Sequence, residues 1–384
     1  MRIAIINTLP VPSGNASVNR FLGYGKELVR MGVEVDVLTS ARCESCEIEG
    51  VNIISCGNGT SLFGALRKIT KRVRKGGYDA AILISNSLLL IYPLWLACKR
   101  GKVKFLQEKS EFPFVLMKKG FLHGLYAKMY VNTTYRLFDG LIVMTKPLME
   151  YFKDKVRKDC KLLEMPMTVD TERFAIERTE SEYGDYIAYC GNMAGKKDGV
   201  LNLIEAFNLA SSKIGDVKLL LIGGSSNQDD WNRIVDYVKQ TGNQRIVMFG
   251  KATREQMPSL LKNAKALALA RPSSLQSEGG FPTKLGEYLA TGNPVIVTAV
   301  GDIPQYLNET NAFVVEPDNN EAFAATLEKM FANYEQAVAI GKGGQELAQT
   351  IFSSKEQSKR LFNYLESVCE QRCWEIWPFS GRIR

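Results

Sequence analysis

The sequence predicts an α/β fold made of two Rossmann-like domains, each built on a parallel β-sheet. Short apolar runs alternate with helical segments over residues 1–165, and a second series of the same kind begins near residue 186. A polar, acidic stretch at residues 177–185 separates the two series. The chain of 384 residues is long enough for two ordinary domains. We therefore expect two doubly wound parallel sheets that face each other across a cleft.

The first series predicts six strands and at least three helices. The expected strands lie at residues 2–8, 33–39, 51–55, 80–85, 102–107 and 139–145, and helices follow at 18–31 and 62–76. The apolar stretch at residues 80–98 nearly reaches the length of a membrane span. A Ser-Asn-Ser run at residues 85–87 interrupts it, and Pro93 lies within the helical pattern that follows. We therefore interpret it as a buried strand followed by a helix.

The second series repeats this alternation and ends in three helices. The expected strands lie at residues 186–190, 217–223, 245–250, 265–270, 294–298 and 312–317. The expected helices lie at 200–211, 231–239 and 254–263, with another that carries Lys284 and Glu287. These patterns predict a first domain at residues 1–165 and a second at 166–353. The last helix, in residues of about 354–384, is expected to pack back near the first domain.

Composition indicates a globular protein with reduced cysteines. Eight cysteines are present, and the N-terminus enters a strand pattern without the apolar region of a signal peptide. We therefore expect a cytoplasmic location. Cys43 and Cys46 form one Cys-x-x-Cys pair, but the chain has a single histidine. Because structural zinc needs four ligands, we expect no metal site.

The net charge of +8 is unevenly distributed. The expected helix at residues 62–76 carries six Lys or Arg and no acid, and Leu62, Phe63, Leu66, Ile69 and Val73 recur at helical spacing. Such a helix either covers the core with a solvated basic face or docks on an anionic membrane surface. A second basic, aromatic stretch at residues 117–138 favours docking. No zinc-finger spacing or aromatic RNA-binding signature is present, so we expect no nucleic-acid partner.

The run from Gly279 to Thr298 predicts an anion-binding turn. Gly279 and Gly280 allow the backbone to approach a ligand, and Pro282 with Thr283 suits the first turn of a helix. The free amides and dipole of such a helix start attract phosphate, and Lys284 adds a full charge. Glu287 lies one turn further on the same side, where it could accept hydrogen bonds from paired sugar hydroxyls.

Polar loops at the ends of other strands complete the candidate site, because ligands of open α/β sheets bind outside the carboxyl ends of the strands. In the first half one such loop contains Ser13, Gly14, Asn15 and Ser17, Glu108 and Glu111 follow another strand, and His123 lies in the same half. For Glu108 and Glu111 the alternatives are helix capping or surface charge, and for His123 simple packing or exposure. We treat all seven as candidates for the acceptor side.

Several motifs, taken in order, resemble retaining glycosyltransferases of the GT-B fold, of the group 1 or family 4 type found in bacterial glycan biosynthesis. The motifs are MPMTVDTERF, YCGNMAGKKDGVLNLIEAF, VKLLLIGG, SEGGFPTKLGEYLATGNPVIVT and AVGDIPQYL followed by AFVVEPDN. The resemblance covers almost the whole chain. It implies a first domain that binds the acceptor and a second that binds a nucleotide-sugar donor.

The resemblance assigns roles to residues of the second half. Glu287 is expected to bind the donor ribose and Lys197 to grip the diphosphate, without metal or cofactor. Lys197, Lys284 and Glu287 are then the expected catalytic group. The expected donor-binding residues are Gly191, Asn192, Lys251, Glu278, Gly279, Gly280, Phe281, Pro282 and Thr283.

The chain departs from the family pattern at two positions. The family has two glutamates separated by seven residues, and Gly279 stands at the first, with Glu278 one position early. The family also has an arginine after the glycine of the first loop, whereas Asn192 follows Gly191. Our hypothesis is that Lys284 supplies the missing cation.

These observations predict a hexosyltransferase-like enzyme of class EC 2.4. It would move a sugar from a UDP- or GDP-linked donor to a glycan or lipid-linked acceptor in cell-surface polysaccharide or lipopolysaccharide biosynthesis. Association with the inner face of the cell membrane is a further expectation. One alternative is a nucleotide-sugar epimerase of the same architecture, and another is a degenerate transferase that acts as a scaffold.

Overall fold

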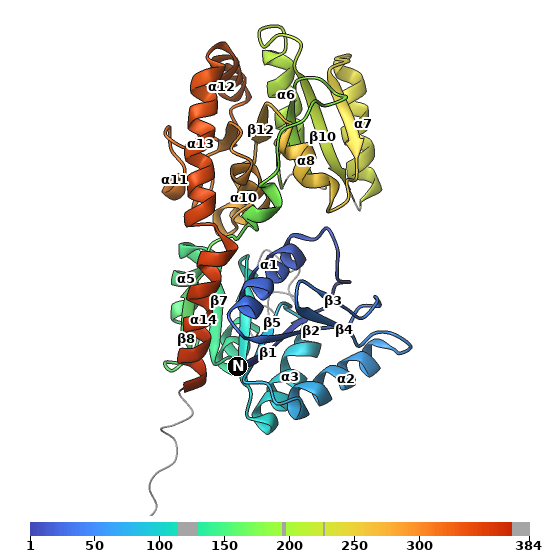
Figure 1. The fold of residues 1–384 in the computed structure, drawn as a ribbon, viewed down its shortest axis with the longest axis vertical. Coiled ribbons are helices and arrows are strands. Elements are labelled where there is room, and N and C mark those ends of the chain that lie inside the picture. Colours follow the sequence, from blue (N-terminus) through green and yellow to red (C-terminus); the bar gives the residue numbers. More distant parts are fainter. Residues whose placement is uncertain (114–129, 194–196, 226, 371–384) are drawn as a thin grey trace, which may run out of the picture.

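The computed structural model describes residues 1–113, 130–193, 197–225 and 227–370. Two α/β domains lie one above the other along the long axis of the molecule (Figure 1). Each contains one sheet, and the order of the strands in both sheets requires repeated crossovers through helices. The expected fold of two parallel-sheet domains is confirmed.

The first sheet has eight strands in the order β3-β4-β2-β1-β5-β6-β7-β8. Their bounds are β1 Arg2–Asn7, β2 Glu34–Thr39, β3 Cys46–Ile48, β4 Val51–Ser55, β5 Ala80–Leu83, β6 Lys104–Lys109, β7 Gly140–Val143 and β8 Lys161–Glu164. The sequence did not predict β3 or β8.

The first sheet is not wholly parallel, because β3 pairs antiparallel with β4 at its edge. A two-residue turn joins the two strands, and Glu49 and Gly50 in it have φ angles of 51° and 83°. Two left-handed residues in succession form the turn that fits the twist of a hairpin. The first sheet is therefore parallel except for this short edge strand, which the sequence did not predict.

Helices cover both faces of the first sheet. They are α1 Ala16–Arg30, α2 Leu62–Lys75, α3 Leu88–Gly101 and α5 Lys146–Lys153. Because side chains alternate along a strand, Ile3 and Ile5 of β1 lie in the core beneath α1, while Ala4 and Ile6 lie in the core beneath α2 and α3. Pro93 lies inside α3, and β5 precedes it, so the apolar stretch at 80–98 is a strand followed by a helix. Among the described residues no helix is both long and apolar enough to cross a membrane.

The second sheet has six parallel strands in the order β11-β10-β9-β12-β13-β14. The strands are β9 Tyr186–Asn192, β10 Lys218–Gly224, β11 Ile246–Gly250, β12 Ala266–Leu269, β13 Val295–Thr298 and β14 Phe313–Val315. The helices are α6 Val200–Ala210, α7 Gln228–Thr241, α8 Gln256–Lys262, α9 Leu275–Gly279, α10 Thr283–Ala290, α11 Ile303–Tyr306, α12 Asn320–Ala332 and α13 Tyr334–Thr350.

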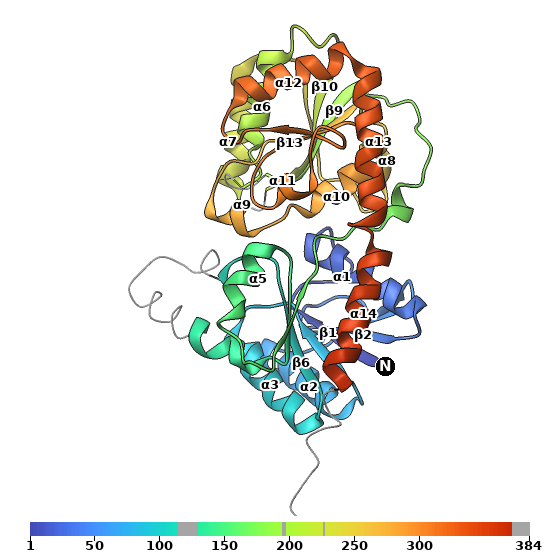
Figure 2. The same cartoon turned by 90° about the vertical axis from the view of Figure 1, so that its left-hand side faces the viewer.

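The chain crosses between the domains twice. The first crossing follows β8, and the second joins α13 to α14, Ser354–Glu370, which packs beside α1 on the first domain (Figure 2). The two crossings lie side by side, since the amide of Val169 donates to the carbonyl of Phe352 at 2.8 Å and the amide of Ser354 donates to that of Val169 at 2.9 Å. Leu361 and Leu365 of α14 are fully buried in the core beneath α1.

Candidate functional site

The carboxyl ends of β9 and β12 and the start of α10 form one edge of the second sheet, next to the first domain. Gly191 and Asn192 end β9, and Lys284 lies in the first turn of α10. The hydroxyl of Thr145, in the first domain, donates to the carbonyl of Gly279 at 3.2 Å. The predicted donor residues and the first domain therefore meet at this edge.

Lys284 forms a buried ion pair. Its Nζ lies 2.6 Å from Oδ2 of Asp198 and donates to the hydroxyl of Tyr189 at 3.2 Å. Burial disfavours the Asp198 carboxylate, but Lys284 and then Arg271 outweigh it and hold the pKa of Asp198 below its ordinary value. The charge of Lys284 is therefore already shared with a carboxylate.

Gly191 is required by this arrangement. Its φ angle of 148° is one that side chains rarely adopt, and a Cβ there would lie 2.0 Å from Nζ of Lys284. The sequence assigned Gly191 to the donor. The structure adds that this glycine leaves room for the lysine.

Glu287 lies one turn after Lys284 on α10 and pairs with Arg173. The distance between Arg173 Nη1 and Glu287 Oε1 is 3.3 Å, and the two side chains are 17% and 20% exposed. Burial raises the pKa of Glu287 despite the opposing effect of Arg173. Arg173 lies in the short helix Thr171–Phe174, within the first crossing, and also donates to the carbonyl of Arg254 at 2.9 Å. The sequence motif contained Arg173, but nothing in it indicated this partner.

Lys197 and Glu111 lie together across the two domains. Lys197 Nζ is 2.6 Å from Glu111 Oε1, and Gln276 Nε2 donates to the same oxygen at 3.4 Å. The sequence placed the lysine with the donor and the glutamate with the acceptor. Because Lys197 and Glu111 form an ion pair with each other, any anion that binds Lys197 must compete with Glu111.

Gly279 is a point of close approach between the domains. A Cβ there would lie 2.2 Å from Cδ2 of Phe112, whose ring packs edge-on against Tyr151 with centroids 5.3 Å apart. The Phe112 ring therefore fills the space that a side chain at position 279 would need.

The other predicted donor residues have different surroundings. Phe281 is buried and its ring packs against Tyr306 and Phe352, while Pro282 caps α10 and Thr283 begins it. Gly280 is buried, and a Cβ there would lie 3.0 Å from the carbonyl of Gln276. Asn192, Lys251 and Glu278 are exposed.

The first-domain candidates divide into several environments. Asn15 is the N-cap of α1 and accepts from the amide and hydroxyl of Ser17, so capping accounts for both side chains. Gly14 is exposed, and Ser13 is half-buried. His123 lies outside the described residues.

Glu108 is neither a helix cap nor a surface charge. Its side chain is 8% exposed, its Oε1 lies 2.6 Å from Nε of Arg20, and the Tyr24 hydroxyl donates to its Oε2 at 3.0 Å. Arg20 also donates to the carbonyls of Met165 and Pro166. Both alternatives weighed for Glu108 are therefore wrong, because Glu108 orients an arginine that holds the first crossing.

Three charged residues near the candidate site were missed from the sequence: Asp198, Arg271 and Lys109. Asp198 directly follows Lys197, Lys109 ends β6, and Arg271 lies two residues after the end of β12. Ligands of open α/β sheets bind near the carboxyl ends of the strands, so a charged residue at such an end could have been predicted as a site residue from its position alone. Lys109 is 2% exposed, donates to Asn86 Oδ1, and burial lowers its pKa to about 7.

The surface of α2 and α3 is apolar at one end and basic along its length. Leu62 and Phe63 of α2 are 59% and 74% exposed, and Leu89 of neighbouring α3 is 61% exposed. Ile69 and Val73 are buried, so the apolar stripe of α2 covers the core only in its second half. We call Leu62, Phe63, Leu89, Tyr92 and Leu96 the apolar patch.

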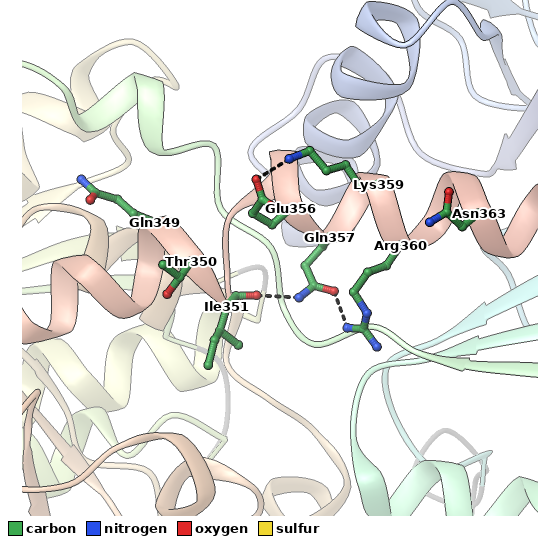
Figure 3. Close-up of a pocket in the computed structure, with 8 residues that line it drawn as sticks. All are labelled: Gln349, Thr350, Ile351, Glu356, Gln357, Lys359, Arg360 and Asn363. Atoms are coloured by element: carbon green, nitrogen blue, oxygen red, sulfur yellow. Dashed lines mark hydrogen bonds and ion pairs between the residues drawn. The ribbon is translucent and has the colours of Figure 1, made fainter.

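A hollow of about 490 Å³ lies at the junction of α13 and α14, away from the candidate site (Figure 3). Its polar side chains bind one another: Gln357 donates to the carbonyl of Ile351 at 2.6 Å and accepts from Arg360 at 2.7 Å. None of the predicted site residues lines it. These bonds fix the start of α14 after the second crossing.

Comparison with known proteins identifies relatives of both the sequence and the fold. The family model described as glycosyl transferases group 1 matches residues 184–333. The capsular polysaccharide biosynthesis glycosyltransferase CapM of Staphylococcus aureus is 29% identical over 181 residues. That match covers 46% of this chain and 45% of CapM, so the chain matches about half the length of this relative.

Two solved structures match nearly the whole chain. Sucrose-phosphate synthase from Thermosynechococcus elongatus gives a TM-score of 0.74 at 19% identity and covers 96% of this chain and 99% of that one. HepE from Anabaena, in complex with UDP-glucose, gives a TM-score of 0.73 at 14% identity, and the match covers 96% of this chain and 100% of HepE. At these identities the likeness concerns the fold, and it confirms the expected GT-B architecture.

Proposed function

We propose that this chain, whose residues 184–333 belong to the glycosyl transferases group 1 family and whose fold is GT-B, is a retaining glycosyltransferase. It moves a sugar from a UDP- or GDP-linked donor to a glycan or lipid-linked acceptor. The observation that carries the proposal is the meeting of Lys197, Lys284 and the start of α10 at the edge of the second sheet next to the first domain. The residue roles and the domain assignment at 1–165 and 166–353 are part of this proposal.

The relatives support the donor and the pathway. CapM acts in capsular polysaccharide biosynthesis, and the HepE structure contains UDP-glucose. We extend these properties to this chain as a role in cell-surface polysaccharide or lipopolysaccharide biosynthesis, in the cytoplasm.

The proposed chemistry depends on stabilising the nucleoside diphosphate as it leaves. Lys197 and the free amides of the first turn of α10 bind the diphosphate, where negative charge develops. Lys284, which shares its charge with Asp198, adds to the positive field at this point. In retaining transfer the acceptor hydroxyl attacks from the face of the leaving group, and a phosphate oxygen accepts its proton.

Glu287 is proposed to accept hydrogen bonds from the donor ribose. Its pairing with Arg173 holds the carboxylate on the inner side of α10. Glu111 must release Lys197 when the diphosphate binds, because both compete for the same ammonium group. Donor binding is thereby linked to a contact with the first domain.

A screen of UDP- and GDP-sugars tests the proposal, with consumption of donor and formation of product followed by mass spectrometry. We expect binding of at least one donor and turnover with a suitable glycan or lipid-linked acceptor. Conversion of the donor without an acceptor into an isomeric sugar nucleotide would identify an epimerase instead. Nucleotide binding without any consumption would favour a scaffold, and no binding at all would refute the proposal.

Lys284→Ala tests the contribution of α10 to donor binding. We expect affinity for the donor found in the screen to fall about 10-fold, the order of one charge-assisted interaction. Lys213→Ala is the matched control, because Lys213 pairs with Glu328 on the exposed surface of the same domain. Unchanged affinity in Lys284→Ala would remove Lys284 from the site.

Association with an anionic membrane surface is the last part of the proposal. The apolar patch lies beside six basic residues of α2 that the sequence placed on its polar face, namely Arg67, Lys68, Lys71, Arg72, Arg74 and Lys75. Apolar insertion combined with basic charge is the usual requirement for such docking.

A further inference from the structure

Arg271 is a buried guanidinium with an unused donor. It follows β12, and only 2% of its surface is exposed. Its Nη1 is buried without a hydrogen-bond partner among the described residues. Leaving such a group unsatisfied is costly, so this donor has the capacity to bind a water molecule or a ligand.

Arg271 lies next to residues 197–199, which directly precede α6. Strands β12 and β9 are adjacent, and Nε of Arg271 lies 3.4 Å from the carbonyl of Lys197. Gly199 has a φ angle of 65°, and a Cβ there would lie 1.7 Å from the carbonyl of Ala270. The loop can approach the end of β12 this closely only because residue 199 is glycine.

The loop ends in a helix start that lacks a side-chain cap. Gly199 is the N-cap of the 11-residue helix α6, and no side chain accepts from the first amides of α6. These amides and the helix dipole attract an anion. This is a second observation, independent of Arg271, that favours a negatively charged ligand at the same point.

The charges around Arg271 leave an excess of positive charge. Asp198 pairs with Lys284 at 2.6 Å, whereas its other oxygen lies 3.7 Å from Nε of Arg271. Asp198 is therefore shared between two cations, and its hydrogen bond goes to the lysine. Glu111, the other carboxylate that acts on Arg271, is itself paired with Lys197. The guanidinium keeps capacity for a further anion.

We propose that Arg271 and the first amides of α6 form a subsite for a phosphate group of the donor. The inference rests on the proposed function and extends it. A planar guanidinium can bind two phosphate oxygens at once, whereas Lys197 and Lys284 act as point charges. In this subsite Arg271, which follows β12, supplies an arginine beyond the end of the strand adjacent to β9, whose last residue is Asn192.

The test measures binding by calorimetry with UDP and GDP as probes, and with uridine and guanosine as probes without phosphate. For the nucleotide that the wild type binds, we expect Arg271→Gln to bind about 10- to 100-fold more weakly, as for loss of charge-assisted hydrogen bonds. Affinity for the corresponding nucleoside is expected to stay within about twofold. Inorganic pyrophosphate is expected to compete with UDP or GDP in the wild type and more weakly in the variant.

The control is Arg245→Gln, in the same domain, where Arg245 donates to the carbonyls of Gly215 and Ser211 and to no predicted site residue. It is expected to bind nucleotide as the wild type does. If Arg271→Gln does not fold, Arg271→Lys replaces it, since it keeps the charge and loses the planar fork. A smaller loss, still confined to the phosphate-bearing probes, is then expected.

The outcomes separate the two proposals. If the wild type binds neither UDP nor GDP, the proposed function fails. If the wild type binds one of them and the folded Arg271 variant binds it equally well, the subsite is refuted and the function stands. An equal loss for nucleoside and nucleotide also refutes it, because Arg271 would then only support the shape of the domain.

Discussion

Lys109 differs from the other buried charges near the candidate site because no carboxylate is paired with it in the described part of the chain. Lys284 pairs with Asp198, and Glu287 pairs with Arg173. Lys109 instead donates to the Asn86 amide oxygen and lies 5.4 Å from the centre of the Tyr135 ring. Burial lowers its pKa from the ordinary 10.5 to about 7.

This lysine should make stability depend on pH. Between pH 7 and 10.5 the unfolded chain binds a proton at Lys109 that the folded chain does not, so the free energy of unfolding rises with pH. Below about pH 7 both states are protonated, and the cost of the buried charge is fully present. We expect Lys109→Met to be more stable than the wild type at pH 7. Its free energy of unfolding should also rise less steeply with pH than that of the wild type, by up to about 1.4 kcal/mol per pH unit.

Urea unfolding at pH 6.5, 7.5 and 8.5 measures both quantities. Lys109→Arg serves as the control, because arginine stays charged throughout this range. This variant should lose the pH dependence of the free energy of unfolding but keep the cost of burying a charge at position 109. It should therefore be less stable than the wild type at pH 8.5. Parallel pH profiles for all three proteins would show that position 109 does not control the dependence.

Residue contacts of this kind could be predicted only in part from the sequence. Lys197, Lys284 and Glu287 could be chosen from motifs because each motif is local. The partner of Lys284 could not, since Asp198 lies 86 residues away and meets it only because β9 ends and α10 begins at the same edge. The Arg173 partner of Glu287 lies 114 residues away, in the first crossing.

At the scale of elements, α2 shows why an amphipathic pattern has two meanings. The apolar stripe predicted a face packed on the core, and Ile69 and Val73 are indeed buried. Leu62 and Phe63 belong to the same stripe but extend beyond the core at the start of the helix. Periodicity fixes the direction of a side chain relative to its helix, but only the packed structure determines whether another element covers it.

Removing the exposed end of this stripe should weaken membrane association. We expect the double variant Leu62→Ser, Phe63→Ser to float with anionic liposomes about 10-fold less than the wild type at low salt. Leu209→Ser is the matched control, because Leu209 is 49% exposed on the second domain. Co-flotation with phosphatidylglycerol vesicles measures the difference. Equal flotation of the double variant and the control would exclude the apolar patch as the docking surface.

Short elements without a periodic pattern were not predictable. Strand β3 has three residues, none of them fully buried, and its Glu49–Gly50 turn lacks the usual Asn-Gly or Asp-Gly signal. Strand β4, by contrast, lies at the predicted residues 51–55. Residues 46–48 therefore form a strand because they pair with β4, and their own sequence carries no strand pattern.

At the scale of the whole molecule, the last helix of the chain helps to build the first domain. The hydroxyl of Tyr364 in α14 donates to the carbonyl of Lys161 in β8 at 2.9 Å, and Leu365 is fully buried beneath α1. The alternation of strands and helices predicted both sheets. The packing of the last helix on the first sheet depends on contacts between residues far apart in the sequence. The sequence pattern alone therefore does not determine which sheet this helix covers.

Leu365→Ala should therefore destabilise the first domain in particular. Truncating a fully buried leucine costs about 2–5 kcal/mol. We expect hydrogen exchange to become faster in α1 and β1 while the strands of the second sheet keep their protection. Leu327→Ala is the control, because Leu327 is equally buried in α12 of the second domain and should give the reverse pattern. Uniform loss of protection in both variants would mean that the two domains unfold as one unit.

The two crossings between the domains constrain how one domain can move relative to the other. A single connection would let one domain swivel freely on the other. Here Val169 and Ser353 form a β-bridge, and Arg20 donates to the backbone carbonyls of Met165 and Pro166 in the first crossing. Twisting one domain against the other would therefore break several hydrogen bonds at once. We expect bending about the two bridged crossings to be easier than twisting, because bending can leave these hydrogen bonds intact. In such a bend Lys197 would leave and regain Glu111 along one arc, so the two halves of the proposed site would return to the same relative position.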